Sequence, residues 1–435
     1  MKSHNLDEAE PALSQTSGPL LAALSEQSSE ALTRSGLVLI AKNEIEEALE
    51  RLRIAAKRSY MPAMLEVARI LLFLRDATAD VQEAQELLQA CERAGDPQAS
   101  YLLAMVELGR PDRQRDPDRI LRRLRHAAQR GFIPALRGLA LLAGRGARRG
   151  DQVTACMLMS EAANAGDATS ALLLAERWRL ADGVAADPAR AEHMLRQLLA
   201  AGHSPLPVVP ARRLGWPAGS EDDVSQLDIG SALRAPTARV LSANPSVRLI
   251  EGLLTPEECR FLIAMARPYL RRSRAFDPDQ QAAGEYAIRT SSDAAFDVTM
   301  EDFYLRLLQA RIAEAGGCAL RQGEPLVVLS YAPTQHYLPH RDYLPPAALA
   351  ARQPGAGQRR TTVCVYLNSV AAGGQTRFLV PGIDVEPVAG NAVVFENLHP
   401  DGRPDPDSQH AGMPVITGEK WLATLWLRER NFRRY

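Results

Sequence analysis

Residues 331–342 read YAPTQHYLPHRD and place His340 and Asp342 two positions apart. In an extended chain, side chains two residues apart project to the same side, so this imidazole and this carboxylate can meet at one point. His410 follows 70 residues after His340. Two histidines and one carboxylate form the facial triad that holds Fe(II) and leaves coordination positions open. The stretch therefore predicts an iron site with His340, Asp342 and His410 as metal ligands.

The sequence around these residues predicts short strands. Apolar and β-branched runs bounded by Gly and Pro occupy residues 326–331, 361–367, 392–395 and 420–427. Many short strands with turn signals between them favour a sandwich or jelly roll. Two helices are expected beside them. One begins at a capping box of Thr255 and Glu258 and runs to about residue 267, and the other covers residues 301–315.

The last predicted strand carries a cation. Alternation along it places Lys420, Leu422, Thr424, Trp426 and Arg428 on one face. A carboxylate that enters a largely apolar barrel needs a buried positive charge. We therefore expect Lys420 to hold the distal carboxylate of a 2-oxo acid that chelates the iron, with Trp426 as a wall of the pocket. Oxidation of that cosubstrate by O2 would yield succinate and carbon dioxide.

The N-terminal half repeats every 36 residues or so. Small residues recur at Ser59, Gly95, Gly131, Gly166 and Gly202, with separations of 36, 36, 35 and 36 residues. Two further columns keep this phase, one of aspartates (Asp80, Asp116, Asp151, Asp187) and one of alanines (Ala48, Ala84, Ala155, Ala191). The aspartates are expected to stand just before helices and the glycines to close them. Helical hairpins of this size must stack on one another, which predicts an α-solenoid.

The patterns predict a multidomain protein in four segments. These are a disordered N-terminus (1–25), an α-helical repeat domain (26–205), a proline-punctuated linker (206–242) and a domain with the iron site (243–435). The fold class is an α-solenoid followed by a double-stranded β-helix, or jelly roll, with flanking helices. A fragment that begins near Ala243 is expected to fold alone, because the predicted core signals lie on either side of the linker.

Composition excludes several classes of protein. Lys and Arg number 51 against 52 Asp and Glu, and this balance argues against a nucleic-acid partner. The N-terminus is polar, and no apolar run reaches the ~18 residues that span a bilayer, so we expect a cytoplasmic protein without a membrane partner. The five cysteines form no C-x-x-C pair and are expected to be reduced thiols.

Several motifs together carry a family resemblance. They are YAPTQHYLPHRD at 331–342, YLN at 366–368, GGQTRF at 373–378, HAGMPV at 410–415 and GEKW at 418–421. This constellation resembles the prolyl 4-hydroxylase branch of the 2-oxoglutarate oxygenases from about residue 245 to 430. The motifs AAQRG at 127–131 and AANAG at 162–166 resemble Sel1-like repeats, which are relatives of tetratricopeptide repeats.

The resemblance implies cofactors and site residues. Fe(II) would lie at His340, Asp342 and His410, and 2-oxoglutarate would be held by Lys420 and the hydroxyl of Tyr331, with O2 as second cosubstrate and ascorbate as a candidate reductant. The positions that match substrate-binding residues are Tyr337, Arg289, one of Arg359 or Arg360, and Arg428. A surface salt bridge is the alternative role for each arginine.

The chain also departs from the family pattern. Thr334 stands where Gly is usual, Gln375 where Glu is frequent, and Arg428 where a substrate-side His is frequent. These departures leave the iron ligands intact but weaken the case for prolyl specificity. Residues 345–358, rich in Ala, Pro and Gly, are expected to form a mobile loop over the site.

Two functions remain open. The first is a hydroxylase of a prolyl or other residue in a peptide or protein recruited with the repeats. The second is an oxygenase of a free amino acid or other small molecule, with the repeats as a regulatory module. Residues 110–149 carry twelve arginines and three aspartates, which form either a basic docking face or an ordinary solvated helix surface.

Overall fold

The computed structural model describes residue 24 and residues 26–433, apart from 75–77, 111–114, 212–226, 274, 278–281, 285–288 and 352–353. Almost all of the predicted disordered N-terminus, and residues 212–226 of the predicted linker, lie outside the described residues. The chain forms two compact units, Met1–Ala99 and Ser100–Tyr435. The four predicted segments stay a prediction, because the boundary between the two compact units does not coincide with any of the predicted boundaries.

The first unit is a stack of helices. They are α2 (Ser29–Ala41), α3 (Ile45–Lys57), α4 (Met61–Phe73) and α5 (Thr78–Arg93), and each packs against the next. Ala48 of α3 and Ala84 of α5, from the alanine column, are fully buried. An ion pair of 2.6 Å between Arg53 and Glu83 joins α3 to α5. Small buried residues at the repeat period allow this close stacking.

The helical repeats continue in the second unit. After α6 (Pro97–Leu108), which crosses the division between the units, come α7 (Pro117–Gln129), α8 (Ile133–Arg145), α9 (Arg149–Asn164), α10 (Ala168–Leu180) and α11 (Pro188–Ala200). The five residues of the glycine column all have a left-handed φ, between 59° and 96°, two residues after a helix ends. Glycine adopts this conformation without strain, which confirms the predicted role of the column in ending helices.

The aspartate column has two structural roles. Asp116 and Asp187 are N-caps of α7 and α11, and each accepts the backbone N–H three residues on, as predicted. Asp80 and Asp151 lie inside the first turns of α5 and α9, so the prediction that they precede their helices was wrong. A carboxylate in the first turn still interacts favourably with the helix dipole, which accounts for the shared residue type.

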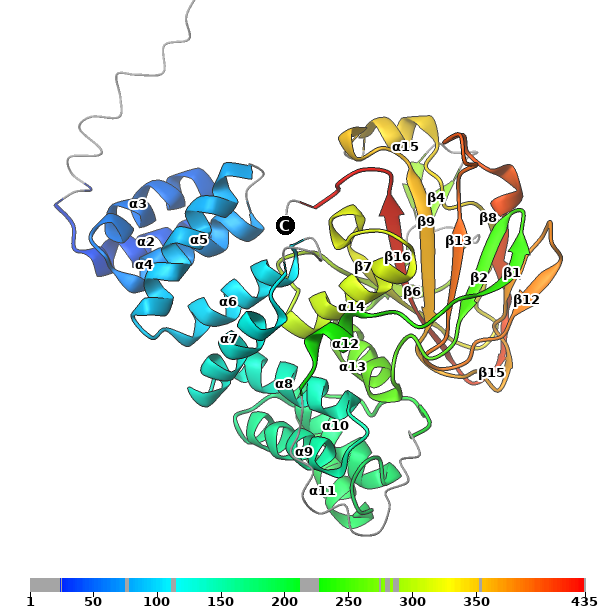
Figure 1. Ribbon diagram of the computed structural model, residues 1–435, viewed down its shortest axis with the longest axis horizontal. Helices are drawn as coiled ribbons and strands as arrows, with labels where there is room; N and C mark the ends of the chain where they lie inside the picture. Colours follow the sequence, from blue (N-terminus) through cyan, green and yellow to red (C-terminus); the bar gives the residue numbers. More distant parts are fainter. Residues whose placement is uncertain are drawn as a thin grey trace, which may run out of the picture. The chain divides into compact units, whose positions relative to one another are not determined.

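The C-terminal part of the second unit contains two main antiparallel sheets (Figure 1). The larger has the order β1 (Arg239–Ala243), β2 (Ser246–Ile250), β13 (Ala392–Glu396), β9 (Arg359–Tyr366), β16 (Lys420–Arg428), β7 (Leu326–Tyr331), β6 (Ser292–Phe296) and β3 (Arg271–Arg272). The smaller has the order β12 (Ile383–Val385), β11 (Thr376–Phe378), β14 (His410–Gly412) and β8 (Tyr337–His340). The four predicted strands correspond to β7, β9, β13 and β16 and are confirmed.

The two sheets share one apolar core. Phe378 and Val385 of the smaller sheet pack in the same buried cluster as Val327, Phe395 and Leu422 of the larger sheet. Inward-facing residues of both sheets thus close over a common interior. This arrangement is a double-stranded β-helix, as predicted.

The two predicted flanking helices are present. They are α13 (Pro256–Ala266), which begins with the predicted capping box, and α14 (Phe303–Ala315). Both contact the larger sheet, α13 at β6 and β7 and α14 at β9 and β16. On their other side they contact repeat helices, α8 and α10 for α13 and α8 for α14. The flanking helices therefore lie between the repeats and the larger sheet.

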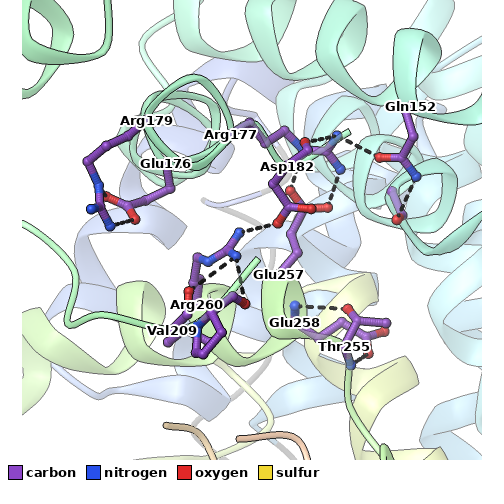
Figure 2. A network of polar contacts seen from close by, with 12 residues as sticks. Gln152, Glu176, Arg177, Arg179, Asp182, Val209, Thr255, Glu257, Glu258 and Arg260 are labelled. Atoms are coloured by element: carbon purple, nitrogen blue, oxygen red, sulfur yellow. Dashed lines mark hydrogen bonds and ion pairs between the residues drawn. The ribbon is translucent and has the colours of Figure 1, made fainter. Parts of the chain in front are cut away.

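Buried ion pairs cross this junction (Figure 2). Arg177 of α10 donates to both carboxylate oxygens of Glu257 on α13, at 2.5 Å each. Arg260 of α13 pairs with Asp182 at 2.8 Å, and both side chains are withdrawn from water. A fragment that starts near Ala243 would leave Glu257 and Arg260 without these partners. The structure therefore argues against the expectation that such a fragment folds alone.

Part of the arginine-rich stretch serves the same junction. Arg137 pairs with Asp302 at 2.9 Å, and Arg145 pairs with Glu258 at 2.8 Å. Arg119 pairs with Glu107, also at 2.8 Å. These three side chains form ion pairs within their own unit, so they contribute little to a free basic docking face.

Three smaller expectations concern single segments and the cysteines. Residues 345–358 include α15 (Pro346–Ala351) and a 3-10 turn (Pro354–Ala356), and the expectation that this segment is mobile stays a prediction. All five cysteines are free thiols, as predicted, and Cys91, Cys259 and Cys364 are buried. Within the described part of the chain, no helix combines the length and apolarity needed to cross a membrane.

Candidate active site

The structure brings the three predicted iron ligands together. His340 ends β8, Asp342 follows two residues later, and His410 begins β14. Strands β8 and β14 pair with His340 and His410 as direct partners. The ligand atoms of the three side chains all lie within 4.8 Å of one another, the one such group of potential metal ligands among the described residues.

Backbone carbonyls orient both imidazoles. Nδ1 of His340 lies 2.9 Å from the carbonyl oxygen of Leu338, and Nδ1 of His410 lies 3.0 Å from that of Ser408. A carbonyl can only accept, so the proton resides on Nδ1 and the Nε2 lone pair is free. Nε2 of His340 lies 3.6 Å from Oδ1 of Asp342, and Nε2 of His410 lies 3.9 Å from Oδ2. Both lone pairs are thus available near the carboxylate.

The electrostatics of the site suit a divalent cation. Withdrawal from water, together with nearby His410, lowers the pKa of His340 to about 3, so this imidazole is neutral at pH 7. Burial opposes ionisation of Asp342, but the neighbouring histidines and Arg359 outweigh it and hold the pKa of the carboxyl below its usual range. A metal ion requires a deprotonated imidazole Nε2 and an ionised carboxylate. The residues present therefore fit Fe(II).

Lys420 occupies the predicted place beside this group. It begins β16, pairs in register with Tyr331 of β7, and is 2% exposed. Burial lowers the pKa of its ammonium to about 8. Its Nζ lies 5.6 Å from the ring centre of Tyr331 and 5.5 Å from that of Tyr366, and no described residue forms a hydrogen bond or ion pair with it. A buried cation without an anion is costly, so the site is suited to an anionic ligand.

One pocket joins the predicted groups. Its lining combines the three metal-ligand candidates with Lys420 and predicted cosubstrate and substrate residues, and consists of Arg289, Leu329, Tyr331, Tyr337, His340, Asp342, Cys364, Thr376, His410, Gly412, Lys420, Leu422, Thr424 and Trp426. Trp426 lies on the same face of β16 as Lys420, and its indole Nε1 is buried with no hydrogen-bond partner among the described residues. Burial raises the pKa of Tyr331, so its hydroxyl stays protonated.

Tyr337 and Arg289 lie next to the first histidine. The Tyr337 ring stacks on His340, with ring centres 3.4 Å apart and an interplanar angle of 15°. The Arg289 guanidinium lies 5.2 Å from the centre of the Tyr337 ring, and its Nε donates to Ser291 at 3.2 Å. An ion pair of 3.5 Å with Asp293 holds the same arginine. Both predicted substrate residues therefore line the pocket.

The other three arginines lie elsewhere. Arg359 donates twice to Glu324 at 2.7 Å and stacks over Trp426 at 3.9 Å from the ring centre, so it supports the pocket wall from behind. Arg428 is fully buried and donates to Glu324 at 2.9 Å. Arg360 points outward and lies 3.9 Å from a carboxylate oxygen of Glu396.

Arg428, unlike Lys420 and Trp426, does not line the pocket. The pairing of β16 with β9 is irregular at this point, because Leu427 and Arg428 lie opposite Thr361 and Arg359, so the extra residue belongs to β9 and the alternation along β16 continues to Arg428. Of the two neighbouring arginines left open by the sequence, Arg359 is the one near the pocket.

Two departures from the family pattern have visible consequences. Thr334 has φ 72°, in the left-handed region that glycine adopts without strain, and its N–H donates to the carbonyl of Val415 at 2.8 Å. Gln375 forms a contact of 3.3 Å with the carboxylate of Glu386. Neither residue lines the pocket.

Some polar residues of the site were not singled out from the sequence. Thr376 and Cys364 line the pocket, and Thr362 donates a hydrogen bond of 2.9 Å to Oδ2 of Asp342. Thr362 and Cys364 alternate along β9 on one face, so the predicted strand at 361–367 contained the signal. The sequence does not show which face of that strand meets the metal site.

Comparisons with known proteins agree with this geometry. The 2OG-Fe(II) oxygenase superfamily matches residues 326–428. Prolyl 4-hydroxylase 1 of Arabidopsis thaliana is 34% identical over 226 residues, which cover 48% of this chain and 77% of the relative. Probable prolyl 4-hydroxylase 3 of the same plant is 31% identical over 246 residues, which cover 49% of this chain and 84% of the relative.

Two solved structures are also similar to parts of the chain. The viral collagen prolyl hydroxylase vCPH of Paramecium Bursaria Chlorella virus-1 is 26% identical with a TM-score of 0.33, and the match covers 42% of this chain and 95% of that one. A Sel1 repeat protein of Oxalobacter formigenes is 16% identical with a TM-score of 0.35, covering 40% of this chain and 74% of that one. On the sequence identity to the two plant enzymes and the extent of their coverage, the chain belongs to the prolyl 4-hydroxylase family of Fe(II)- and 2-oxoglutarate-dependent dioxygenases.

Proposed function

We propose that this dioxygenase hydroxylates a prolyl or other residue of a peptide or protein recruited with the help of the repeats. The reaction consumes O2 and 2-oxoglutarate and releases succinate and carbon dioxide. One observation carries the proposal. The pocket that contains the His340, Asp342 and His410 group also contains Lys420, a buried cation with no anion beside it in the described part of the chain.

We assign iron binding to His340, Asp342 and His410. When bound, Fe(II) couples oxidation of 2-oxoglutarate by O2 to insertion of an oxygen atom into a substrate C–H bond. The protein supplies two imidazoles, each oriented by a backbone carbonyl, and one carboxylate whose pKa is held below its usual range. Three protein ligands leave positions open for the cosubstrates.

We assign the distal carboxylate of 2-oxoglutarate to Lys420 and Tyr331. Their side chains are on paired residues of neighbouring strands, so an ammonium and a protonated hydroxyl can serve one carboxylate. Trp426 would exclude water from this end of the pocket. Ascorbate is proposed as the reductant that restores iron after turnover without a substrate.

On the substrate side, we assign contacts to Tyr337 and Arg289, with Arg359 as support for Trp426. The similar plant proteins are named a prolyl 4-hydroxylase and a probable prolyl 4-hydroxylase, which favours a prolyl substrate here. Arg428 pairs with Glu324 instead of facing a substrate, so the family's usual histidine contact is replaced by a closed ion pair. This difference predicts a sequence preference unlike that of the relatives.

The small-molecule alternative has a structural observation in its favour. Arg137 and Arg145, from the basic stretch, bind carboxylates of Asp302 and Glu258 at the junction with the flanking helices. These repeats therefore have a structural role that requires no partner.

A direct comparison of substrates tests the proposal. Purified enzyme with Fe(II), 2-oxoglutarate and ascorbate would be given a library of proline-containing peptides, a matched library without proline, and free L-proline. Mass spectrometry would score added oxygen, and succinate would be measured in parallel. Oxygen added to peptides supports the proposal. Oxygen added only to the free amino acid would replace it with the small-molecule alternative.

A further inference from the structure

The carboxylate of the iron site is held by a chain of two buried polar side chains. Thr362 of β9 donates from Oγ1 to Oδ2 of Asp342 at 2.9 Å. Asn397, directly after β13, donates from Nδ2 to Oγ1 of Thr362, also at 2.9 Å. Thr362 and Asn397 are both fully buried. These two hydrogen bonds lead from the larger sheet inward to the group of metal ligands.

The direction of the hydrogen bonds follows from the chemistry of a hydroxyl group. A threonine hydroxyl has a single hydrogen, so it cannot donate to Asp342 and to a side-chain amide oxygen at the same time. Because the NH2 group of Asn397 faces Thr362, the hydroxyl accepts from Asn397, and its hydrogen points to Asp342. An ionised carboxylate only accepts, so this polarity suits the form that binds a metal.

The arrangement has a cost that indicates selection for function. The other amide atom of Asn397, Oδ1, is buried and has no hydrogen-bond partner among the described residues. A buried unsatisfied acceptor is unfavourable for folding. An aliphatic residue would avoid that cost but would lose the donor that sets the orientation of the Thr362 hydroxyl.

We propose that Thr362 and Asn397 are positioning residues that orient Asp342 for metal binding, with Asn397 acting only through Thr362. The inference rests on the proposed iron site at His340, Asp342 and His410. The two residues touch neither substrate nor cosubstrate in this role. They restrict the carboxylate to one rotamer, so that less ordering accompanies metal binding.

The neighbouring threonine offers a matched control. Thr361 is also fully buried on β9, but its hydroxyl donates to Glu396 at 2.8 Å on the other face of the strand. Replacement of Thr361 by Val removes a hydroxyl of the same type from the same strand without touching Asp342.

The test is calorimetric titration of metal-free protein with Co(II), an air-stable divalent probe, together with thermal unfolding of each variant. Thr362→Val should weaken Co(II) binding about 10- to 100-fold, the usual effect of losing an outer contact to a metal ligand. Thr362→Ser, which keeps the hydroxyl, should restore most of the affinity. Asn397→Leu should weaken binding less than Thr362→Val while leaving the unfolding temperature unchanged or higher. Thr361→Val should bind as the wild type does.

The double variant Thr362→Val, Asn397→Leu tests whether Asn397 acts through its hydrogen bond to Thr362. It should bind Co(II) as weakly as Thr362→Val alone, because without the hydroxyl Asn397 has nothing to orient. If the losses of Co(II) affinity in the two single variants multiply in the double variant, the two residues act independently and the proposal that Asn397 acts through Thr362 is wrong. Wild-type affinity in folded Thr362→Val would overturn the positioning role. Failure of the proposed iron site is a separate result, in which wild-type protein and His410→Ala bind Co(II) equally.

Discussion

Replacement of Arg177 by Met should destabilise the second unit of the molecule. Arg177 makes two hydrogen bonds of 2.5 Å to Glu257 and a third, of 2.8 Å, to Gln152, and its side chain is 2% exposed. Removal of the Arg177 guanidinium leaves the Glu257 carboxylate buried without the positive charge that pairs with it. Breaking a buried pair in this way costs about 3–5 kcal/mol. This is a large fraction of the ~5–15 kcal/mol that stabilises a typical domain.

The double variant separates the charge effect from simple loss of packing. With Glu257→Leu added to Arg177→Met, no charge is left unpaired, and apolar residues in place of a buried pair are often neutral for stability. The double variant should therefore recover more than half of the loss in the free energy of unfolding.

Urea unfolding, followed by far-ultraviolet circular dichroism and tryptophan fluorescence, measures both effects. The fluorescence signal and the part of the helical signal that comes from the second unit should change in one transition, since α10 and α13 belong to the same compact unit. A single variant as stable as the wild type, or a double variant that loses the sum of the two single losses, would refute the reasoning.

Three further predictions concern the pocket and the junction. Lys420→Met should raise the 2-oxoglutarate concentration needed for half-maximal succinate formation far more than it weakens Co(II) binding, and equal losses would make Lys420 a structural residue. Because burial lowers the pKa of Lys420 to about 8, its positive charge is present below that pH and lost above it. The affinity for 2-oxoglutarate, measured by calorimetry from pH 7 to 9.5, should therefore fall above about pH 8, and Lys420→Met should remove that dependence. Gly144→Ala should lower the unfolding temperature, because the new methyl group would collide with the Glu257 carboxylate. Gly138→Ala is the control, because its methyl group meets only the Phe303 ring at 3.5 Å and should be tolerated. Equal effects of the two substitutions on the unfolding temperature would argue against a tight junction.

Local sequence patterns account for much of the fold. The glycine column predicted helix ends because a left-handed φ two residues after a helix strongly favours glycine, and Gly95 and Gly131 show that conformation. The His340 and Asp342 spacing predicted a shared metal site because alternation in an extended chain is a local property. Thr255 and Glu258 predicted a helix start for the same reason.

Features that depend on contacts between distant residues could not be predicted. Arg177 and Glu257 are 80 residues apart, and nothing in the sequence around either one indicates the other. Arg428 was assigned to the substrate side because its position matches the family pattern, but it pairs with Glu324, which is 104 residues away in the sequence. Asn397 shows no motif at all, since its role depends on where β13 brings it relative to Thr362.

The main revision of the sequence-based expectations is that the catalytic part is not independent of the repeats. Helices α8 and α10 contact the flanking helices of the β-helix, and Arg145 binds the Glu258 carboxylate that Arg311 of α14 also binds, at 2.9 Å. A protein cut near Ala243 would lose the partner on one side of that shared carboxylate. Studies of the catalytic part should therefore retain the chain from Ser100 onward.

The central claim is that His340, Asp342 and His410 hold the iron that drives turnover. The most direct test is to measure Fe(II) binding under anaerobic conditions, and succinate formation from 2-oxoglutarate in air, for the wild type and for Asp342→Ala of the full chain. The wild type should bind Fe(II) and form succinate, whereas Asp342→Ala should remain folded and do neither. Succinate formation by Asp342→Ala at the wild-type rate would contradict the assignment.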